Sequence, residues 1–105
     1  MSQVDPAGAL NRLSQATAWL VDVREPAEVQ RVAFDDPRTL LMPLSELERR
    51  HTDLPRDAEL ILACASGGRS QMAAQFLRQR GHPQVVNLAG GLSAWLAHGL
   101  PVRRS

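Results

Sequence analysis

The sequence predicts an α/β protein in which the strands form one mostly parallel sheet. Short apolar runs of strand length alternate along the chain with segments whose apolar residues recur every three or four positions. One run, residues 18–23, is apolar at nearly every position, as is typical of a strand covered on both faces. Parallel strands need a crossover between them, usually a helix, so this alternation favours a parallel sheet.

The first elements have clear start signals. A short edge strand is expected at 2–4, and Asp5 is the expected N-cap of an amphipathic helix that runs from Pro6 to about residue 16. After the strand at 18–23, Pro26 is expected to open a short helix through Val29.

The middle of the chain is less regular. Residues 30–38 are polar and predict only a turn, at Asp35-Asp36-Pro37. Residues 39–42 are expected to form a short buried strand. Ser45 and Glu48 match a capping box at the start of the next helix, which is expected to end near Arg50.

The second half repeats the alternation. Strands are expected at 59–63 and 85–88, with a helix ending near Gly81 between them and a final helix at 93–98. The helix before Gly81 is expected to bury one face, made up of Met72, Ala73, Phe76 and Leu77. The two tryptophans are interpreted as core residues, Trp19 and Trp95.

Composition limits the classes of function. At 105 residues the chain is expected to form one domain, large enough for a core without disulfides or metals. The formal net charge is +1, from twelve arginines, no lysine and eleven acidic residues, which gives no support for a nucleic-acid partner. The single cysteine excludes an internal disulfide, and no cysteine–histidine cluster predicts a metal or other cofactor. No signal peptide or membrane span is predicted, so a cytoplasmic location is expected.

The lone cysteine, Cys64, lies where the expected strand 59–63 passes into a loop. Such a loop can turn successive backbone N–H groups toward one point, and the N-terminus of the following helix adds its positive end. A thiol there should ionise more readily than a free cysteine, whose pKa is about 8.5. The sequence therefore predicts a nucleophile at Cys64 and an anion cradle around it, made up of Ala65, Ser66, Gly67, Gly68, Arg69 and Ser70.

These residues also have plainer interpretations. A free cysteine is often a buried core residue, and two glycines can form an ordinary turn. The position of Cys64 beside Ser-Gly-Gly-Arg favours the nucleophile. Arg69 is either a surface cation or, as its place at the helix start favours, a group that holds an anionic donor or braces the loop.

Asp22 and Arg24 lie at the end of the strand 18–23, next to the expected site. They are equally consistent with a pocket rim and with a structural ion pair. Glu25 and Glu28 are interpreted as solvated or capping residues. No histidine is placed to act as a base for Cys64, and all three are expected at the surface: His51, His82 and His98.

Several ordered motifs resemble those of the rhodanese-like sulfurtransferases in their small single-domain form. Residues 22–26, Asp-Val-Arg-Glu-Pro, match the first signature of that family. Residues 64–70, Cys-Ala-Ser-Gly-Gly-Arg-Ser, match its active-site loop, with glycine fourth and arginine sixth. The closing signature is matched by residues 87–91, by Ala94-Trp95 and by residues 99–102.

The resemblance covers nearly the whole chain. It implies a five-stranded, mostly parallel sheet flanked by helices on both faces, in a single domain over 1–105. It also implies transfer of sulfane sulfur through a persulfide on Cys64. The donor would be thiosulfate, a polysulfide or a persulfide, and the acceptor a thiol, cyanide or a sulfur-accepting protein.

Two departures from the family pattern bear on the donor and the pocket. Residues 30–41 lack the usual Gly-His-Ile…Gly-Ala stretch, which forms one rim of the pocket. Ala65 stands where thiosulfate-preferring members often carry a basic residue, which leaves the donor open.

Two other functions are kept as alternatives. Cysteine phosphatases and arsenate reductases also combine a cysteine, a cradle and an arginine, but with five residues between cysteine and arginine. Four residues separate Cys64 from Arg69, a spacing that should fit a single sulfur atom better than a tetrahedral oxyanion. The other alternative is a sulfur-carrier or binding module with little turnover of its own.

Overall fold

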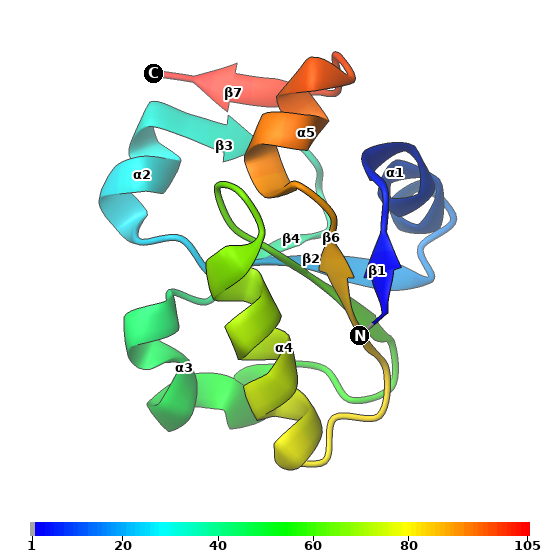
Figure 1. The fold of residues 1–105 in the computed structure, drawn as a ribbon, viewed down its shortest axis with the longest axis vertical. Coiled ribbons are helices and arrows are strands. Elements are labelled where there is room, and N and C mark those ends of the chain that lie inside the picture. Colours follow the sequence, from blue (N-terminus) through cyan, green and yellow to red (C-terminus); the bar gives the residue numbers. More distant parts are fainter. Residues whose placement is uncertain (1) are drawn as a thin grey trace.

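The computed structural model describes residues 2–105, whose strands form two sheets (Figure 1). The larger sheet has five strands in the order β1–β6–β5–β2–β4, and every neighbouring pair is parallel. The predicted five-stranded parallel sheet is therefore confirmed. Its strands are β1 (Gln3–Val4), β2 (Ala18–Asp22), β4 (Thr39–Leu41), β5 (Glu59–Ala63) and β6 (Val85–Leu88).

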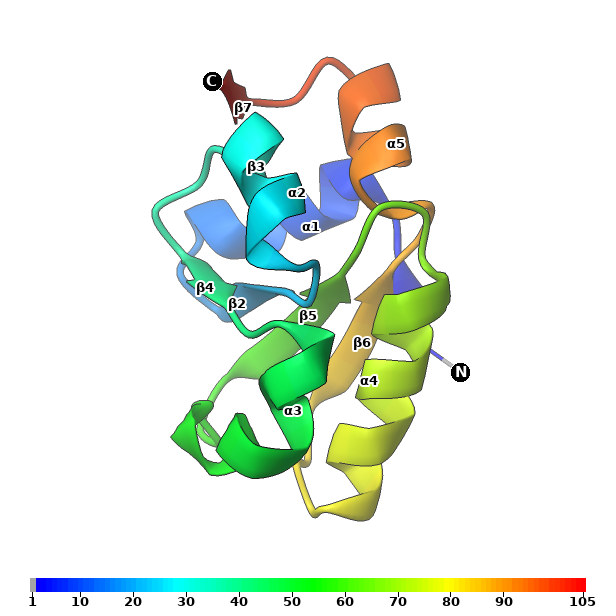
Figure 2. The same ribbon diagram turned by 90° about the vertical axis from the view of Figure 1, so that its left-hand side faces the viewer.

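Helices cover both faces of this sheet, as expected (Figures 1 and 2). Side chains of α1 (Pro6–Ser14) and α5 (Gly91–Ala97) pack in one core, and those of α3 (Leu44–Arg50) and α4 (Gly68–Gln79) in the other. Two shorter elements complete the helices, α2 (Pro26–Arg31) and the 3₁₀-helix η1 (His51–Asp53). No helix in the described part of the chain is both long and apolar enough to cross a membrane.

The side chains of the central strand β5 alternate between the two cores. Leu60 and Leu62 pack on the side of α3 and α4, and Ile61 and Ala63 on the side of α1 and α5. This alternation follows from the two-residue period of a strand. All four are at most 1% exposed, which explains why the sequence of this strand is a continuous apolar run.

A second sheet of two antiparallel strands was not expected from the sequence. β3 (Val32–Phe34) pairs with β7 (Val102–Arg104), so residues far apart in the chain lie side by side. Phe34 is 2% exposed and packs edge-on against Trp95, with 5.2 Å between ring centroids. Strands of three residues are too short to show a period, so only this packing reveals them.

The structure corrects several expectations about burial. The strand expected at 39–42 is an edge strand that ends at Leu41, and Leu41 is 43% exposed. Met72, expected in the buried face of α4, is 64% exposed. The buried face of α4 contains Ser70, Ala73, Ala74 and Leu77. Because one of these positions holds a polar residue, Ser70, the pattern of apolar residues predicted a shifted face.

Three further side chains differ from expectation. Ser45 forms no capping box, since α3 begins at Leu44 and the Ser45 hydroxyl instead donates to Glu25 Oε1 at 2.7 Å. His82 is 3% exposed rather than at the surface, and burial together with the charge of Arg56 lowers its pKa. Trp19 is half-buried, with the Arg38 guanidinium 3.9 Å above its ring.

Candidate active site

Cys64 follows the last residue of β5 and is 1% exposed. The loop that begins there rises from the carboxyl edge of the sheet and enters α4 at Gly68 (Figures 1 and 2). The end of β2 lies beside it, because Asp22 pairs in register with Ala63. The two candidate regions of the sequence therefore meet at one edge of the sheet, where ligands of parallel sheets bind.

Two groups lie within hydrogen-bonding distance of the sulfur of Cys64 and can donate to it. The backbone N–H of Gly67 lies 3.0 Å from Sγ, and the hydroxyl of Ser70 lies 3.3 Å from it. Gly67 has φ 112°, in the left-handed region that favours glycine. A side chain at Gly68, by contrast, would meet nothing within 4 Å. Of the two loop glycines, Gly67 is thus the one that the conformation requires.

The N-terminus of α5 holds the backbone of the same loop. Leu92 N–H donates to the carbonyl oxygen of Cys64 at 2.8 Å, and Ser93 N–H donates to that of Ala65 at 3.0 Å. Gly91 permits this approach, since a Cβ there would collide with the Cys64 carbonyl oxygen. No site role was predicted for Gly91, although the double glycine at 90–91 signals a close backbone approach.

The surroundings of Cys64 favour its ionised form. Burial disfavours the thiolate and by itself raises the pKa of Cys64. The Ser70 hydroxyl and the nearby N–H groups of Ser70, Gly67 and Ser66 stabilise the thiolate by more than burial disfavours it, so that the pKa of Cys64 lies below the ordinary thiol value.

Alkylation of Cys64 should therefore titrate below the free-thiol pKa of about 8.5. Only the thiolate reacts, so the rate of reaction with iodoacetamide should stay high as the pH falls to the lowered pKa and decline below it. Restricted access of iodoacetamide to the buried sulfur slows the reaction at every pH but does not move the midpoint, which reports the pKa. Ser70→Ala, which removes one donor to the sulfur, should raise the apparent pKa. A wild-type midpoint at or above the free-thiol value would contradict this account of the loop.

Arg69 makes its hydrogen bonds to α2 and none to the sulfur. Its two terminal nitrogens donate to the two carboxylate oxygens of Glu28 at 2.7 and 2.8 Å. This contact matches one of the predicted roles of Arg69, a brace, here between the start of α4 and α2. Glu28, expected to be solvated or capping, caps α2 by accepting the Glu25 N–H at 3.0 Å and also binds Arg69.

The Arg69–Glu28 pair persists over a wide pH range. The hydrogen bond from Arg69 lowers the pKa of Glu28 from 4.5 to about 2. Stability from the ionised carboxylate is therefore fully present above about pH 4.5 and is lost as the pH falls through about 2. Both side chains are about one third exposed, so solvent limits this stabilisation to less than about 1 kcal/mol.

Asp22 and Arg24 form a buried ion pair at the end of β2. Their side chains are 1% and 3% exposed, and Arg24 Nη2 donates to Asp22 Oδ2 at 2.8 Å. The same nitrogen donates to the carbonyl oxygen of Val32 at 2.9 Å, which ties β2 to β3. The arrangement matches the structural ion pair, and Asp22 also lines a cavity of about 200 Å³, so the pocket-rim role of Asp22 stays a prediction.

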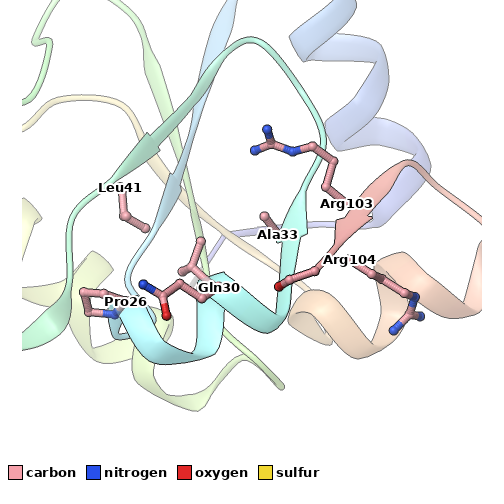
Figure 3. Close-up of a pocket in the computed structure, with 8 residues that line it drawn as sticks. Pro26, Gln30, Ala33, Leu41, Arg103 and Arg104 are labelled. Atoms are coloured by element: carbon pink, nitrogen blue, oxygen red, sulfur yellow. The ribbon is translucent and has the colours of Figure 1, made fainter.

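Three cavities are found away from the sulfur of Cys64, and no residue of 64–70 lines them. The largest of three, about 410 Å³, lies between α2, β4 and β7, as Figure 3 shows. A second cavity of about 200 Å³ is lined in part by Asp22, and a third of about 220 Å³ lies between α3 and α4. Cys64 itself is 1% exposed, and its sulfur lies against the Gly67 N–H and the Ser70 hydroxyl of its own loop.

No histidine takes part in the hydrogen bonds recorded for Cys64. His51 and His82 pack against each other instead, with 6.1 Å between ring centroids. Among residues 2–105, no three His, Cys, Asp or Glu side chains are grouped to hold a metal ion.

Known proteins share both this fold and this sequence pattern. A family model described as a rhodanese-like domain matches residues 5–98. A sulfurtransferase of Allochromatium vinosum is 35% identical over 103 residues, which are 97% of this chain and 94% of the relative. YrkF of Bacillus subtilis, named a candidate sulfur carrier protein, is 34% identical over 72% of this chain, and the match spans 40% of its own length.

A solved structure supports the same grouping. The rhodanese-related protein of Thermoplasma volcanium superposes with a TM-score of 0.87 and 30% sequence identity, over 98% of both chains. The family model takes in Cys64, its loop and the α5 N-terminus that holds the loop, and the Allochromatium relative matches over nearly the full length of both proteins. This chain therefore belongs to the rhodanese-like sulfurtransferase family.

Proposed function

We propose that this protein transfers sulfane sulfur through a persulfide on Cys64, from a small donor to a thiol or cyanide. The observation that carries the proposal is the buried, hydrogen-bonded environment of the Cys64 sulfur. The lone cysteine of the chain is buried at a strand end and receives hydrogen bonds from Gly67 N–H at 3.0 Å and from Ser70 at 3.3 Å. An inert core thiol has no need of such donors, whereas a thiolate or persulfide anion is stabilised by them.

In the first step the Cys64 thiolate attacks the outer sulfur of the donor. A new S–S bond forms as the S–S bond of the donor breaks, and the electron pair of that bond leaves with the rest of the donor. With thiosulfate the leaving group is sulfite, and with a polysulfide or persulfide it is a shorter polysulfide or a thiolate. The negative charge moves to the outer sulfur, about 2 Å beyond Sγ.

In the second step the acceptor attacks that outer sulfur. The Cys64 S–S bond breaks, its electron pair returns to Cys64 as a thiolate, and cyanide leaves as thiocyanate or a thiol as a persulfide. Cys64 attacks as a thiolate that has already lost its proton, so no base is needed beside it. A reducing compartment such as the cytoplasm would supply the thiol acceptor.

The position of Arg69 argues against the phosphatase and arsenate reductase alternative. Those reactions need a guanidinium at the oxyanion, and the guanidinium of Arg69 is bound at both ends to Glu28. The two donors at hydrogen-bonding distance from the sulfur are one backbone N–H and one hydroxyl, which suit a single sulfur atom. The sulfur-carrier alternative is supported by the similarity to YrkF.

Mass measurement and turnover together test the proposal. After incubation with thiosulfate or polysulfide, the protein should gain about 32 Da per sulfur, removable by cyanide or dithiothreitol. Thiocyanate should form over many turnovers, and an aryl phosphate should remain unhydrolysed. An adduct without turnover would favour the carrier. Hydrolysis of the phosphate without any adduct would overturn the proposal.

A further inference from the structure

Asn87 contacts both residues that donate hydrogen bonds to the sulfur. It lies in β6, beside β5, and is 2% exposed. Its Oδ1 is 2.5 Å from the hydroxyl oxygen of Ser70, and its Nδ2 is 3.4 Å from the carbonyl oxygen of Gly67. The amide thus lies directly behind the two groups that face Cys64.

The Ser70 hydroxyl has one proton and three acceptors within reach. Asn87 Oδ1 is 2.5 Å away, Gly67 O is 3.2 Å and Cys64 Sγ is 3.3 Å. A hydroxyl can donate to only one of them at a time. All three side chains are at most 2% exposed: Ser70, Asn87 and Cys64. The loss of one donor in this cluster therefore leaves a buried polar atom without a hydrogen bond.

We propose that Asn87 is a positioning residue whose amide determines whether the Ser70 hydroxyl donates to the sulfur of Cys64. The inference rests on the proposed function, since it assigns Asn87 a part in the same sulfur chemistry.

The charge on the sulfur decides which orientation of the Asn87 amide, and hence which direction of the Ser70 hydroxyl, is favoured. While Cys64 is a neutral thiol, Ser70 donates to Asn87 Oδ1, its nearest acceptor. A hydrogen bond to an ion is about twice as strong as one between neutral groups, so a thiolate or persulfide turns the proton toward the sulfur.

The amide of Asn87 then has to turn over. With the hydroxyl proton on the sulfur side, the oxygens of Ser70 and Asn87 would face each other without a proton between them. Rotation of the amide brings Nδ2 to Ser70, and the contact lengthens toward the 2.7–3.2 Å of an N–H···O bond. The rotation gives up the contact from Nδ2 to the Gly67 carbonyl oxygen, which at 3.4 Å is the longest in the cluster. Asparagine has an acceptor and a donor on one planar group, which suits both charge states.

The charged side chains near the loop are paired elsewhere. Arg69 of α4 binds Glu28 of α2, and Arg24 binds Asp22 of β2. In the structure, none of these four side chains forms a hydrogen bond to Cys64 Sγ, to the Ser70 hydroxyl or to the Asn87 amide. The direction of the hydroxyl therefore depends on the Asn87 amide and on the sulfur.

NMR on the wild-type protein tests the rotation. The side-chain amide signals of Asn87 should shift with pH at the same midpoint as Cys64 alkylation, and should lose that shift in Ser70→Ala. Asn11 is the internal control, because it is the other asparagine of the chain and lies exposed on α1. Asn87 signals that stay constant while Cys64 ionises would overturn the inference.

A double-mutant cycle tests whether Asn87 acts on the Cys64 thiolate through Ser70. Asn87→Leu removes the amide at similar volume and should raise the apparent pKa of Cys64 by about 0.5 unit or more. In the neutral state the Gly67 carbonyl oxygen, 3.2 Å away, can replace Oδ1 as the acceptor for Ser70, whereas in the ionised state nothing replaces the Asn87 N–H that supports the hydroxyl oxygen. In the Ser70→Ala background the same substitution should have no further effect. A purely structural role would lower the unfolding temperature and leave the Cys64 pKa in place. An equal rise in both backgrounds, or no rise in either, would also overturn the inference.

The two hypotheses can fail separately. If Cys64→Ser retains sulfur transfer, the proposed function fails, while the NMR titration still reports the hydrogen bonds around the thiol. If the variant is inactive and the Asn87 signals do not titrate, only the role of Asn87 is lost.

Discussion

Cys64→Ser should abolish the sulfur adduct and all sulfur transfer while leaving the protein folded. The serine hydroxyl is close in size to the thiol and can keep the hydrogen bonds from Gly67 and Ser70. Its oxygen stays protonated at neutral pH and forms no persulfide, so the covalent intermediate is lost. The adduct is measured by mass after thiosulfate or polysulfide treatment, and transfer by thiocyanate formation.

Two controls separate loss of chemistry from loss of fold. The unfolding temperature of Cys64→Ser should stay close to that of the wild type, since the site keeps its packing. Wild-type protein alkylated at Cys64, its only cysteine, should be inactive as well. Thiocyanate formation by Cys64→Ser at a rate near the wild type would refute the assignment of Cys64 as the nucleophile.

Arg24→Leu should destabilise the fold more than any loss of a surface charge. The substitution leaves the carboxylate of Asp22 buried without its guanidinium and removes the donor to the carbonyl oxygen of Val32. Breaking a buried ion pair in this way costs about 3–5 kcal/mol. For a chain of this size that loss should lower the unfolding temperature by more than about 10 °C. Thermal and urea unfolding measure it directly.

A matched variant shows that burial is the cause. Arg12→Leu removes an ion pair of the same chemistry with Glu59, whose side chains are 39% and 22% exposed, and should cost less than about 1 kcal/mol. The double variant Asp22→Leu/Arg24→Leu should recover part of the loss, because no unpaired charge remains buried. Equal costs for Arg24→Leu and Arg12→Leu would show that the buried pair contributes no more than a surface pair.

The parts of the fold with strong local signals were predictable. The strands expected at 59–63 and 85–88 have those bounds in the structure. The helix expected to start at Pro6 has Asp5 as its N-cap, with Gly8 N–H at 2.8 Å. The place of Cys64 at the end of β5 follows from the same kind of reasoning. These features depend on the period of apolar side chains and on capping, both of which are local in sequence.

Where neighbouring side chains come from distant segments, local patterns carried no information. The β3–β7 pairing, the Glu28 partner of Arg69 and the Asn87 partner of Ser70 each join residues that only the topology brings together. Met72 and Leu41 show the same limit, since an apolar side chain is buried only if another element covers it.

The sequence by itself thus determined the class of fold, the cysteine and the loop around it, because each is set by residue type and short spacing. The tertiary structure decided what the loop residues bind. Arg69 braces α2, and Asn87 reaches Ser70 because β6 lies beside β5. Hydrogen bonds of this kind require atoms within about 3 Å of each other, and for residues of different elements that proximity is a property of the packed chain.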